Sequence, residues 1–118
     1  MEEQIKTGNP KCSKVISSIG DALYVIGGKW KLRVIVALRE GNCRFNEIQR
    51  ATSGISARVL SNELKELELN GFISRTVHSG TPVVVEYHLT AYADSLHDIL
   101  SALSSWGMTH RDKLRAER

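Results

Sequence analysis

The sequence is poor in cysteine and proline, and it lacks long apolar runs. Its 118 residues include two cysteines, Cys12 and Cys43, and two prolines. This cysteine content excludes the disulfide framework of a small secreted domain and fits a reducing compartment. No apolar run approaches the roughly 18 residues that a membrane span needs, and no apolar stretch near the start resembles a signal peptide. We therefore expect a cytoplasmic protein without a membrane partner.

Motifs of enzymatic chemistry are also missing. The sequence has no glycine-rich phosphate-binding motif and no set of residues that suggests a nucleophile with its base and acid. Its four histidines and two cysteines show no spacing typical of a metal site. We therefore predict that the protein is not an enzyme, and we expect neither a cofactor nor a metal ion.

The composition is that of one folded domain with a locally basic region. Hydrophobic residues make up 42% of the chain and charged residues 25%, which argues against disorder. The net charge is only +3, but basic residues gather in the stretch 29–58. They are Lys29, Lys31, Arg33, Arg39, Arg44, Arg50 and Arg58, against the acidic Glu40 and Glu47. Such an excess favours a polyanionic partner.

The stretch 56–70 predicts a helix with two different faces. Ser56 suits the N-cap, and Gly71 suits the position that follows the last turn. One face is apolar, with Leu60, Leu64 and Leu67. The opposite face carries Arg58, Ser61, Asn62 and Lys65. These residue types bind phosphates and base edges in a major groove, although a solvated outer face is the commoner explanation for a lone helix.

The neighbouring elements favour the DNA-binding interpretation. Apolar residues at helical spacing predict earlier helices at about 16–26, 29–40 and 44–52. A short glycine turn at 53–54 joins the third to the fourth, as in a helix-turn-helix. At about 72–90 the apolar pattern changes to alternation around a turn, which predicts a β-hairpin. A hairpin directly after the recognition helix is the arrangement of a winged helix.

A last helix is predicted at about 91–110, with Thr90 at its N-cap. Its apolar seam is longer than a small domain needs for its own core and favours a homodimer. The seam consists of Tyr92, Leu96, Ile99, Leu103 and Trp106. The charged residues after this helix are expected to fray.

The predicted fold class is α+β and mostly α. We expect a flexible polar arm over residues 1–12 and a single winged helix-turn-helix domain over 13–118, with the hairpin at about 72–90 as its wing. Additional helices are expected at the N- and C-terminal ends, the last of them with the dimer seam.

Several motifs in fixed order carry a family resemblance. They are IGGKWKL at 26–32, RFNEI at 44–48, GIS at 54–56 and VEYHLT at 85–90. In this combination the sequence resembles the HxlR-type transcriptional regulators, winged-helix proteins related to the MarR group. The resemblance implies a homodimer built through the first and last helices, which binds a two-fold operator in double-stranded DNA to repress, or sometimes activate, neighbouring genes. A winged helix used as a protein-interaction module is the alternative.

The resemblance and the helix pattern together assign candidate residues. Arg58 is the candidate for a guanine edge, and Lys65 for a phosphate. Lys31 lies, like Lys29 and Arg44, at the start of a helix, where phosphates commonly bind. The DNA-binding set is Ser56, Arg58, Ser61, Asn62, Lys65, Arg44, Lys29 and Arg75. The dimer-interface set is Leu23, Leu96, Ile99, Leu103 and Trp106.

The sequence departs from the family pattern at three places. Ser17 and Ser18 stand where many members have Cys-Pro, which leaves Cys12 as the candidate redox sensor beside two lysines. Val84 replaces the usual basic residue of the wing, so the DNA contact of the wing is left to Arg75, His78 or backbone amides. The alanines at 91–93 replace Pro-Leu-Gly and predict a well-formed helix start. A small-molecule or redox effector stays open, and Cys43 is expected to be a buried small apolar side chain.

Overall fold

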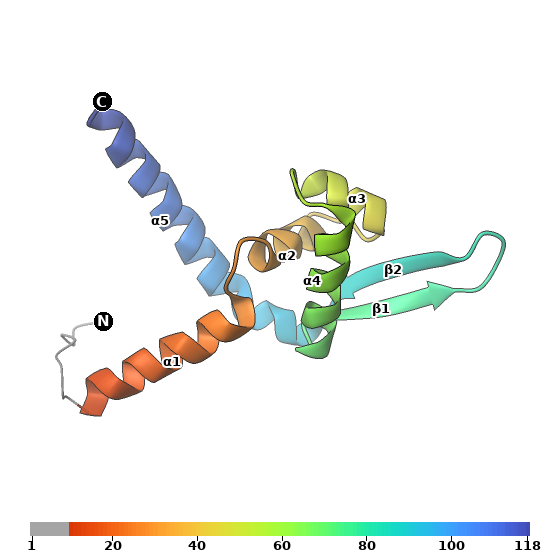
Figure 1. Cartoon of the computed structure of the whole chain (residues 1–118), viewed down its shortest axis with the longest axis horizontal. Helices are drawn as coiled ribbons and strands as arrows, with labels where there is room; N and C mark the ends of the chain where they lie inside the picture. The colour runs from red at the N-terminus through yellow and green to blue at the C-terminus, as the bar shows by residue number, and fades with distance from the viewer. Residues whose placement is uncertain (1–9) are drawn as a thin grey trace.

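A computed structural model describes residues 10–118 and has the winged helix-turn-helix arrangement (Figure 1). Helices α3 and α4 form the helix-turn-helix, and the β1–β2 hairpin directly follows α4. The fold class predicted from the sequence is therefore confirmed. The elements are α1 (Pro10–Ile26), α2 (Lys31–Arg39), α3 (Phe45–Ala51), α4 (Ala57–Leu69), β1 (Ile73–His78), β2 (Val84–Leu89), the 3₁₀ helix η1 (Ala91–Leu96) and α5 (His97–Ala116).

Helix α4 has the ends that its sequence predicts. The Ser56 hydroxyl accepts a hydrogen bond from the backbone N–H of Val59 at 3.1 Å, which satisfies one free donor of the first turn. At the other end Gly71 adopts a φ of 83°, a conformation that favours glycine. The backbone N–H of Phe72 then donates to the carbonyl of Leu67 at 3.0 Å, as in a Schellman motif. Both boundaries are thus set by local interactions.

The core lies where α2, α3 and α4 meet the base of the hairpin. Leu60, Leu64 and Leu67 of α4 are at most 2% exposed. They belong to the same apolar cluster as α2, which the sequence predicted to be central. The other buried apolar residues are Ile26, Val34, Ile35, Ala37, Leu38, Ile48, Ile55, Phe72, Ile73, Ala93 and Leu96.

An ion-pair cluster also joins α2 to α4. The ammonium of Lys31 lies 2.8 Å from a carboxylate oxygen of Glu63 and 2.6 Å from one of Glu66. Burial by itself lowers the pKa of Lys31, but the hydrogen bonds to Glu63 and Glu66 outweigh it and raise the pKa. The Lys31 side chain is 13% exposed. The expectation that it would meet a phosphate is wrong, because the carboxylates of α4 already hold it.

The hairpin presents two different faces. The antiparallel register places Arg75 opposite Tyr87 and Ser74 opposite His88. Arg75 and Tyr87 are on the face that lines a hollow with α4. Because side chains alternate along a strand, His88 and its neighbours at even positions lie on the other face. The backbone N–H of Tyr87 also donates to the carbonyl of Cys43 at 2.8 Å, which ties the α2–α3 loop to β2.

The C-terminal helix differs from its prediction. Residues 91–96 form η1, and α5 begins at His97 and continues to Ala116, so the tail is helical rather than frayed. Thr90 makes no side-chain cap, and its hydroxyl donates to the carbonyl of Gly71 instead. Tyr92 stacks on Phe72 with ring centroids 5.1 Å apart. Packing of η1 against the core therefore overrides the helix propensity of the alanines.

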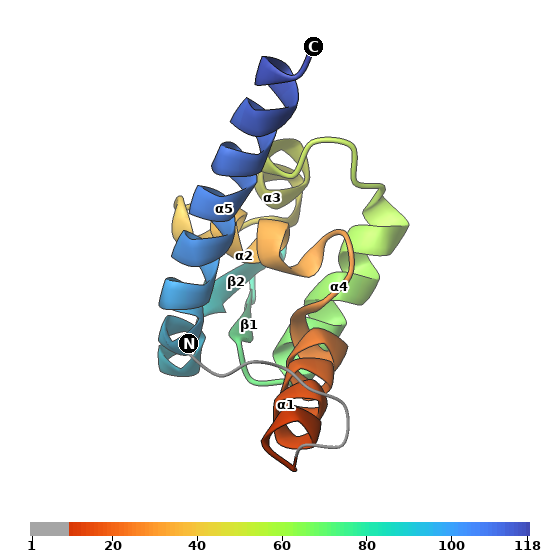
Figure 2. The same ribbon diagram turned by 90° about the vertical axis from the view of Figure 1, so that its left-hand side faces the viewer.

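The N-terminal boundaries also move. Helix α1 (Pro10–Ile26) includes residues 10–12 of the arm predicted over 1–12. Residues 1–9 lie outside the described part of the chain. Figure 1 shows α1 and α5 extending away from the winged-helix body, and Figure 2 shows that they run in different directions. In residues 10–118, the helices are too short or too polar to cross a membrane.

Replacement of Lys31 tests the link between α2 and α4. Lys31→Met should lower the free energy of unfolding by about 1–3 kcal/mol at neutral pH, because it leaves the partly buried Glu63 without its cation.

The stabilisation by Lys31 should also depend on pH. Folding raises the pKa of Lys31, so this stabilisation is complete below the ordinary pKa of 10.5 and is lost as the pH rises through the pKa of the folded state. Urea unfolding measures the change. Lys113→Met, which removes an exposed pair with Glu117, is the control and should cost less than about 0.5 kcal/mol.

Candidate nucleic-acid interface

The face of α4 opposite its leucines is exposed and polar. Arg58, Asn62 and Lys65 are exposed, and Ser61 beside them is half-buried. Burial of the leucine face turns these side chains outward, because the helix repeats every 3.6 residues. Ser56 is also exposed. Its hydroxyl oxygen accepts the cap hydrogen bond and keeps its own proton free to donate.

A hollow between α4 and the wing brings two cations together. Lys65 of α4 and Arg75 of β1 line it with Ser61 and the half-buried Tyr87. The carboxylate of Glu68 is the acidic member of the lining. Two elements separated by a turn thus contribute to one basic surface. The sequence predicted Arg75 as a wing contact without indicating that it would stand beside Lys65, and it gave no signal for Tyr87.

The other flank of α4 has a different charge balance. Its carboxylates at Glu63 and Glu66 are bound to Lys31. Pairing them within the protein reduces the negative charge that α4 would otherwise present near its exposed face. The cations and neutral donors of the outer face, which suit phosphates and base edges, then have Glu68 as the acidic residue beside them.

Lys29 lies in a second basic group, around Trp30. The Lys29 ammonium is 4.8 Å and the Arg33 guanidinium carbon 4.7 Å from the centroid of the Trp30 ring. Arg33 also donates to the carbonyl of Ser53, in the turn before α4, at 3.5 Å. Sequence reasoning counted Arg33 only toward the charge of the region. None of the contacts in the described chain brings Lys29 to the hollow of Lys65 and Arg75.

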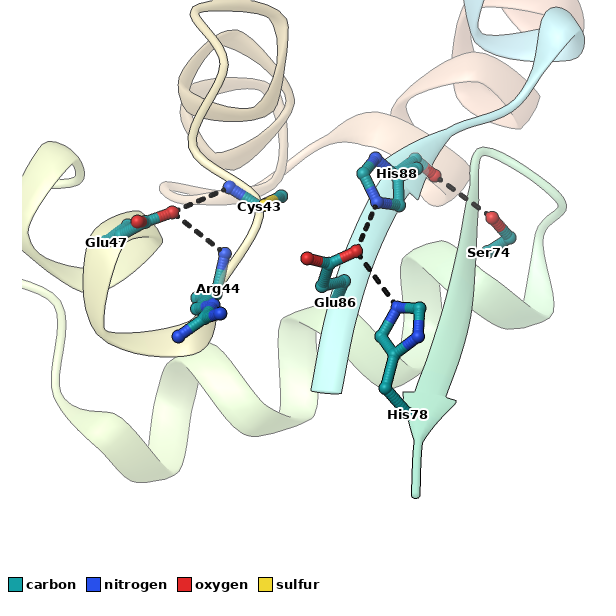
Figure 3. Close-up of polar contacts among 7 residues, drawn as sticks. All are labelled: Cys43, Arg44, Glu47, Ser74, His78, Glu86 and His88. Carbon is teal, nitrogen blue, oxygen red and sulfur yellow. Dashed lines mark hydrogen bonds and ion pairs between the residues drawn. The ribbon is translucent and has the colours of Figure 1, made fainter. Parts of the chain in front are cut away.

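Arg44 stands at the start of α3, where Glu47 orders the backbone. The backbone N–H groups of Cys43 and Arg44 each donate to the same Glu47 oxygen at 3.1 Å (Figure 3). The hydrogen bond from Arg44 and then that from Cys43 lower the pKa of Glu47. Because the Glu47 carboxylate accepts hydrogen bonds from these two backbone N–H groups, they are not free to bind a phosphate. The Arg44 side chain is exposed and remains a candidate contact.

The terminal helices carry exposed apolar side chains. Leu23 of α1 is 60% exposed, and Leu103 and Trp106 of α5 are 52% and 66% exposed. Ile99 is also exposed. Leu96 is not available for an interface, because it is buried in η1 against the core, so its assignment to the dimer contact is wrong. Contiguous exposed apolar faces of this kind typically mark protein–protein contacts.

Of the two cysteine side chains, the structure describes only that of Cys43. The side chain of Cys12, the candidate redox sensor, lies outside the described residues. Cys43 is a free, half-buried thiol and not the fully buried apolar residue that the sequence predicted. It lies in the loop between α2 and α3, beside β2.

Comparison with known proteins identifies the family. Residues 25–115 match the family model described as HxlR-like helix-turn-helix. The chain belongs to the HxlR family. Its winged helix and its exposed α4 face are therefore those of an HxlR protein, a family of helix-turn-helix transcriptional regulators. The predicted function class, a regulator rather than an enzyme, is confirmed.

Individual HxlR relatives agree with this assignment. The chain is 44% identical over 92 residues to an HTH-type transcriptional regulator of Methanothermobacter thermautotrophicus, which covers 78% of this chain and 70% of the relative. It is 39% identical over 97 residues to YtcD of Bacillus subtilis, also named an HTH-type transcriptional regulator, with 82% and 77% covered. The solved structure of the redox regulator HypR in its reduced form has a TM-score of 0.76 at 37% identity, covering 84% of this chain and 98% of that one.

Acid titration tests the role of Glu47 in ordering the start of α3. Glu47→Gln should lower stability at neutral pH, because a neutral amide accepts the two backbone hydrogen bonds more weakly. The pKa of Glu47 is lowered on folding, so its contribution is present above its ordinary value of 4.5 and is lost as the pH falls through the folded value. Urea midpoints of the two proteins should converge in acid. Glu40→Gln is the control, and a gap that persists in acid would contradict this role.

Proposed function

We propose that this chain binds a pseudo-palindromic operator as a homodimer, with α4 of each protomer in a major groove. The observation that carries the proposal is the exposed face of α4, whose Lys65 shares a hollow with Arg75 of the wing. Membership of the HxlR family supports DNA as the partner. The two recognition helices would enter successive major grooves about 34–36 Å apart, which requires a two-fold operator.

Individual side chains take different roles in this proposal. Arg58 lies in the first turn of α4, where a guanidinium can make two hydrogen bonds to a guanine edge. Asn62, one turn later, suits an adenine edge. Lys65 and Arg75 hold a phosphate, and the Ser56 hydroxyl with the first amides of α4 holds another. Lys29 and Arg44 are assigned to phosphates outside this hollow.

The proposed dimer uses the projecting helices α1 and α5. Their apolar faces at Leu23, Ile99, Leu103 and Trp106 would be buried between protomers. An effector would act by favouring one of two dimer states with different spacing of the recognition helices. The name of HypR as a redox regulator supports a redox effector, and Cys12 is the thiol proposed to respond.

Replacement of Arg58 tests base recognition. Arg58→Ala should weaken binding to the operator by about 5- to 150-fold, the equivalent of about 1–3 kcal/mol, and relax the preference at one base pair. Fluorescence anisotropy at fixed salt, with an operator selected from the DNA upstream of the gene, measures the effect. Arg118→Ala removes the same charge at the end of the chain and should leave affinity within about twofold.

The salt dependence of binding separates the two function classes. Affinity of a DNA-binding protein falls steeply with salt because counterions are released. If the Arg58→Ala variant bound the operator with unchanged affinity at fixed salt, Arg58 would be excluded as a base contact. Absence of selective binding at low salt would instead support the protein-interaction module.

A charge placed in the apolar face of α5 tests the dimer. Leu103→Lys should weaken self-association at least about 10-fold, because an unpaired ammonium would be buried between protomers. Sedimentation equilibrium at micromolar concentration measures it. Leu69→Lys is the matched control, since Leu69 is 85% exposed on α4 and away from the proposed contact. A monomeric wild-type chain, or a Leu103→Lys variant that stays dimeric, would contradict the proposed interface.

A further inference from the structure

Three potential metal ligands gather beside β2, on the sheet face away from α4. One ligand atom each from Cys43, Glu86 and His88 lies within 4.8 Å of the other two. His78 joins them through Glu86, since its Nε2 is 3.1 Å from the Glu86 Oε1 atom. Figure 3 shows the two imidazoles on either side of the Glu86 carboxylate, with Cys43 near His88.

The backbone brings these residues together from three segments. Glu86 and His88 are two positions apart on β2, so they share one face of the hairpin. His78 comes from β1, where its pairing with Val84 sets it diagonally across from Glu86. Cys43 is held on both sides, because its carbonyl accepts from Tyr87 and its N–H donates to Glu47.

The distances within the group suit a small tetrahedral ion. With zinc bonds of about 2.0–2.3 Å to nitrogen, oxygen and sulfur, two ligand atoms of a tetrahedral site lie about 3.3–3.6 Å apart. His78 Nε2 and His88 Nε2 are 3.1 and 3.2 Å from Glu86 Oε1. The ligand atoms of Cys43, Glu86 and His88 all lie within 4.8 Å of one another, so side-chain rotations can bring the three to the separations of such a site.

We propose that Cys43, Glu86 and His88 bind a divalent transition-metal ion, with zinc as the best match, and that His78 supports the Glu86 carboxylate through its hydrogen bond. A thiolate and an imidazole favour a borderline-soft ion, whereas magnesium and calcium require oxygen ligands. Hydrogen bonding alone accounts for the two histidines around Glu86, but it leaves the thiol beside them without a role. Cys43 and His88 also line an open hollow of about 610 Å³, through which an ion can enter.

Metal binding would join the wing to the α2–α3 loop. Cys43 belongs to that loop, while Glu86 and His88 belong to the hairpin. The bound ion would therefore hold the wing, and Arg75 on its opposite face, in a fixed position relative to α4. This consequence for DNA rests on the proposed function, whereas metal binding itself does not.

Titration of the reduced full-length chain with cobalt(II) tests the site without DNA. The wild type should develop the charge-transfer absorption of a cobalt–thiolate bond, and zinc should remove it while magnesium should not. Cys43→Ser should lose this absorption. Glu86→Gln and His88→Gln should weaken binding by more than the roughly 10- to 100-fold that removal of an outer-sphere partner costs. Cys12→Ser and His110→Gln are the matched controls and should bind as the wild type does.

Two further measurements keep the test decisive. Zinc should raise the unfolding temperature of the wild type and leave that of Cys43→Ser unchanged, since an ion that binds the folded state stabilises it. X-ray absorption of the zinc-loaded wild type should report one sulfur neighbour, which needs no variant to fold. Absence of cobalt absorption in the wild type, or its loss in Cys12→Ser and not in Cys43→Ser, would overturn the proposal. Failure to bind an operator would overturn the proposed function and leave this result standing.

Discussion

The burial of the leucine face of α4 is the constraint on which the rest of the structure depends. Leu60, Leu64 and Leu67 are removed from water against the core, and each such burial stabilises the fold by roughly 1.5–3 kcal/mol. Because the helix repeats every 3.6 residues, burial of this face also fixes the direction of the side chains on the opposite face. Arg58 and Lys65 must face outward, so the same interaction that builds the core also presents the candidate DNA-binding surface.

The electrostatic character of that surface depends on the neighbours of α4. On one flank Lys31 neutralises Glu63 and Glu66. On the other flank the hairpin brings Arg75 to Lys65. The net charge is only +3, but pairing of Glu63 and Glu66 with Lys31 leaves Lys65 and Arg75 with Glu68 as the acidic residue in their hollow. The charged residues on one flank of α4 therefore stabilise the fold, and those on the other flank belong to the candidate DNA-binding surface.

Much of the fold was predictable because its signals are local. The Ser56 cap, the glycine after α4 and the turn of the hairpin each act within a few residues, and the structure has all three. The start of the last helix was not predictable in this way. Stacking of Tyr92 on Phe72 and burial of Leu96 hold residues 91–96 as a 3₁₀ turn, and both contacts involve the core.

The sequence by itself determined which residues form α4, which of its faces is apolar, and to which family the chain belongs. Only the tertiary structure decided that Lys31 is paired, that Arg75 stands beside Lys65, and that Cys43 meets Glu86 and His88. Periodicity and spacing report on residues within one element. These three arrangements are distances between elements, and such distances are set by how helices and strands pack around a shared core.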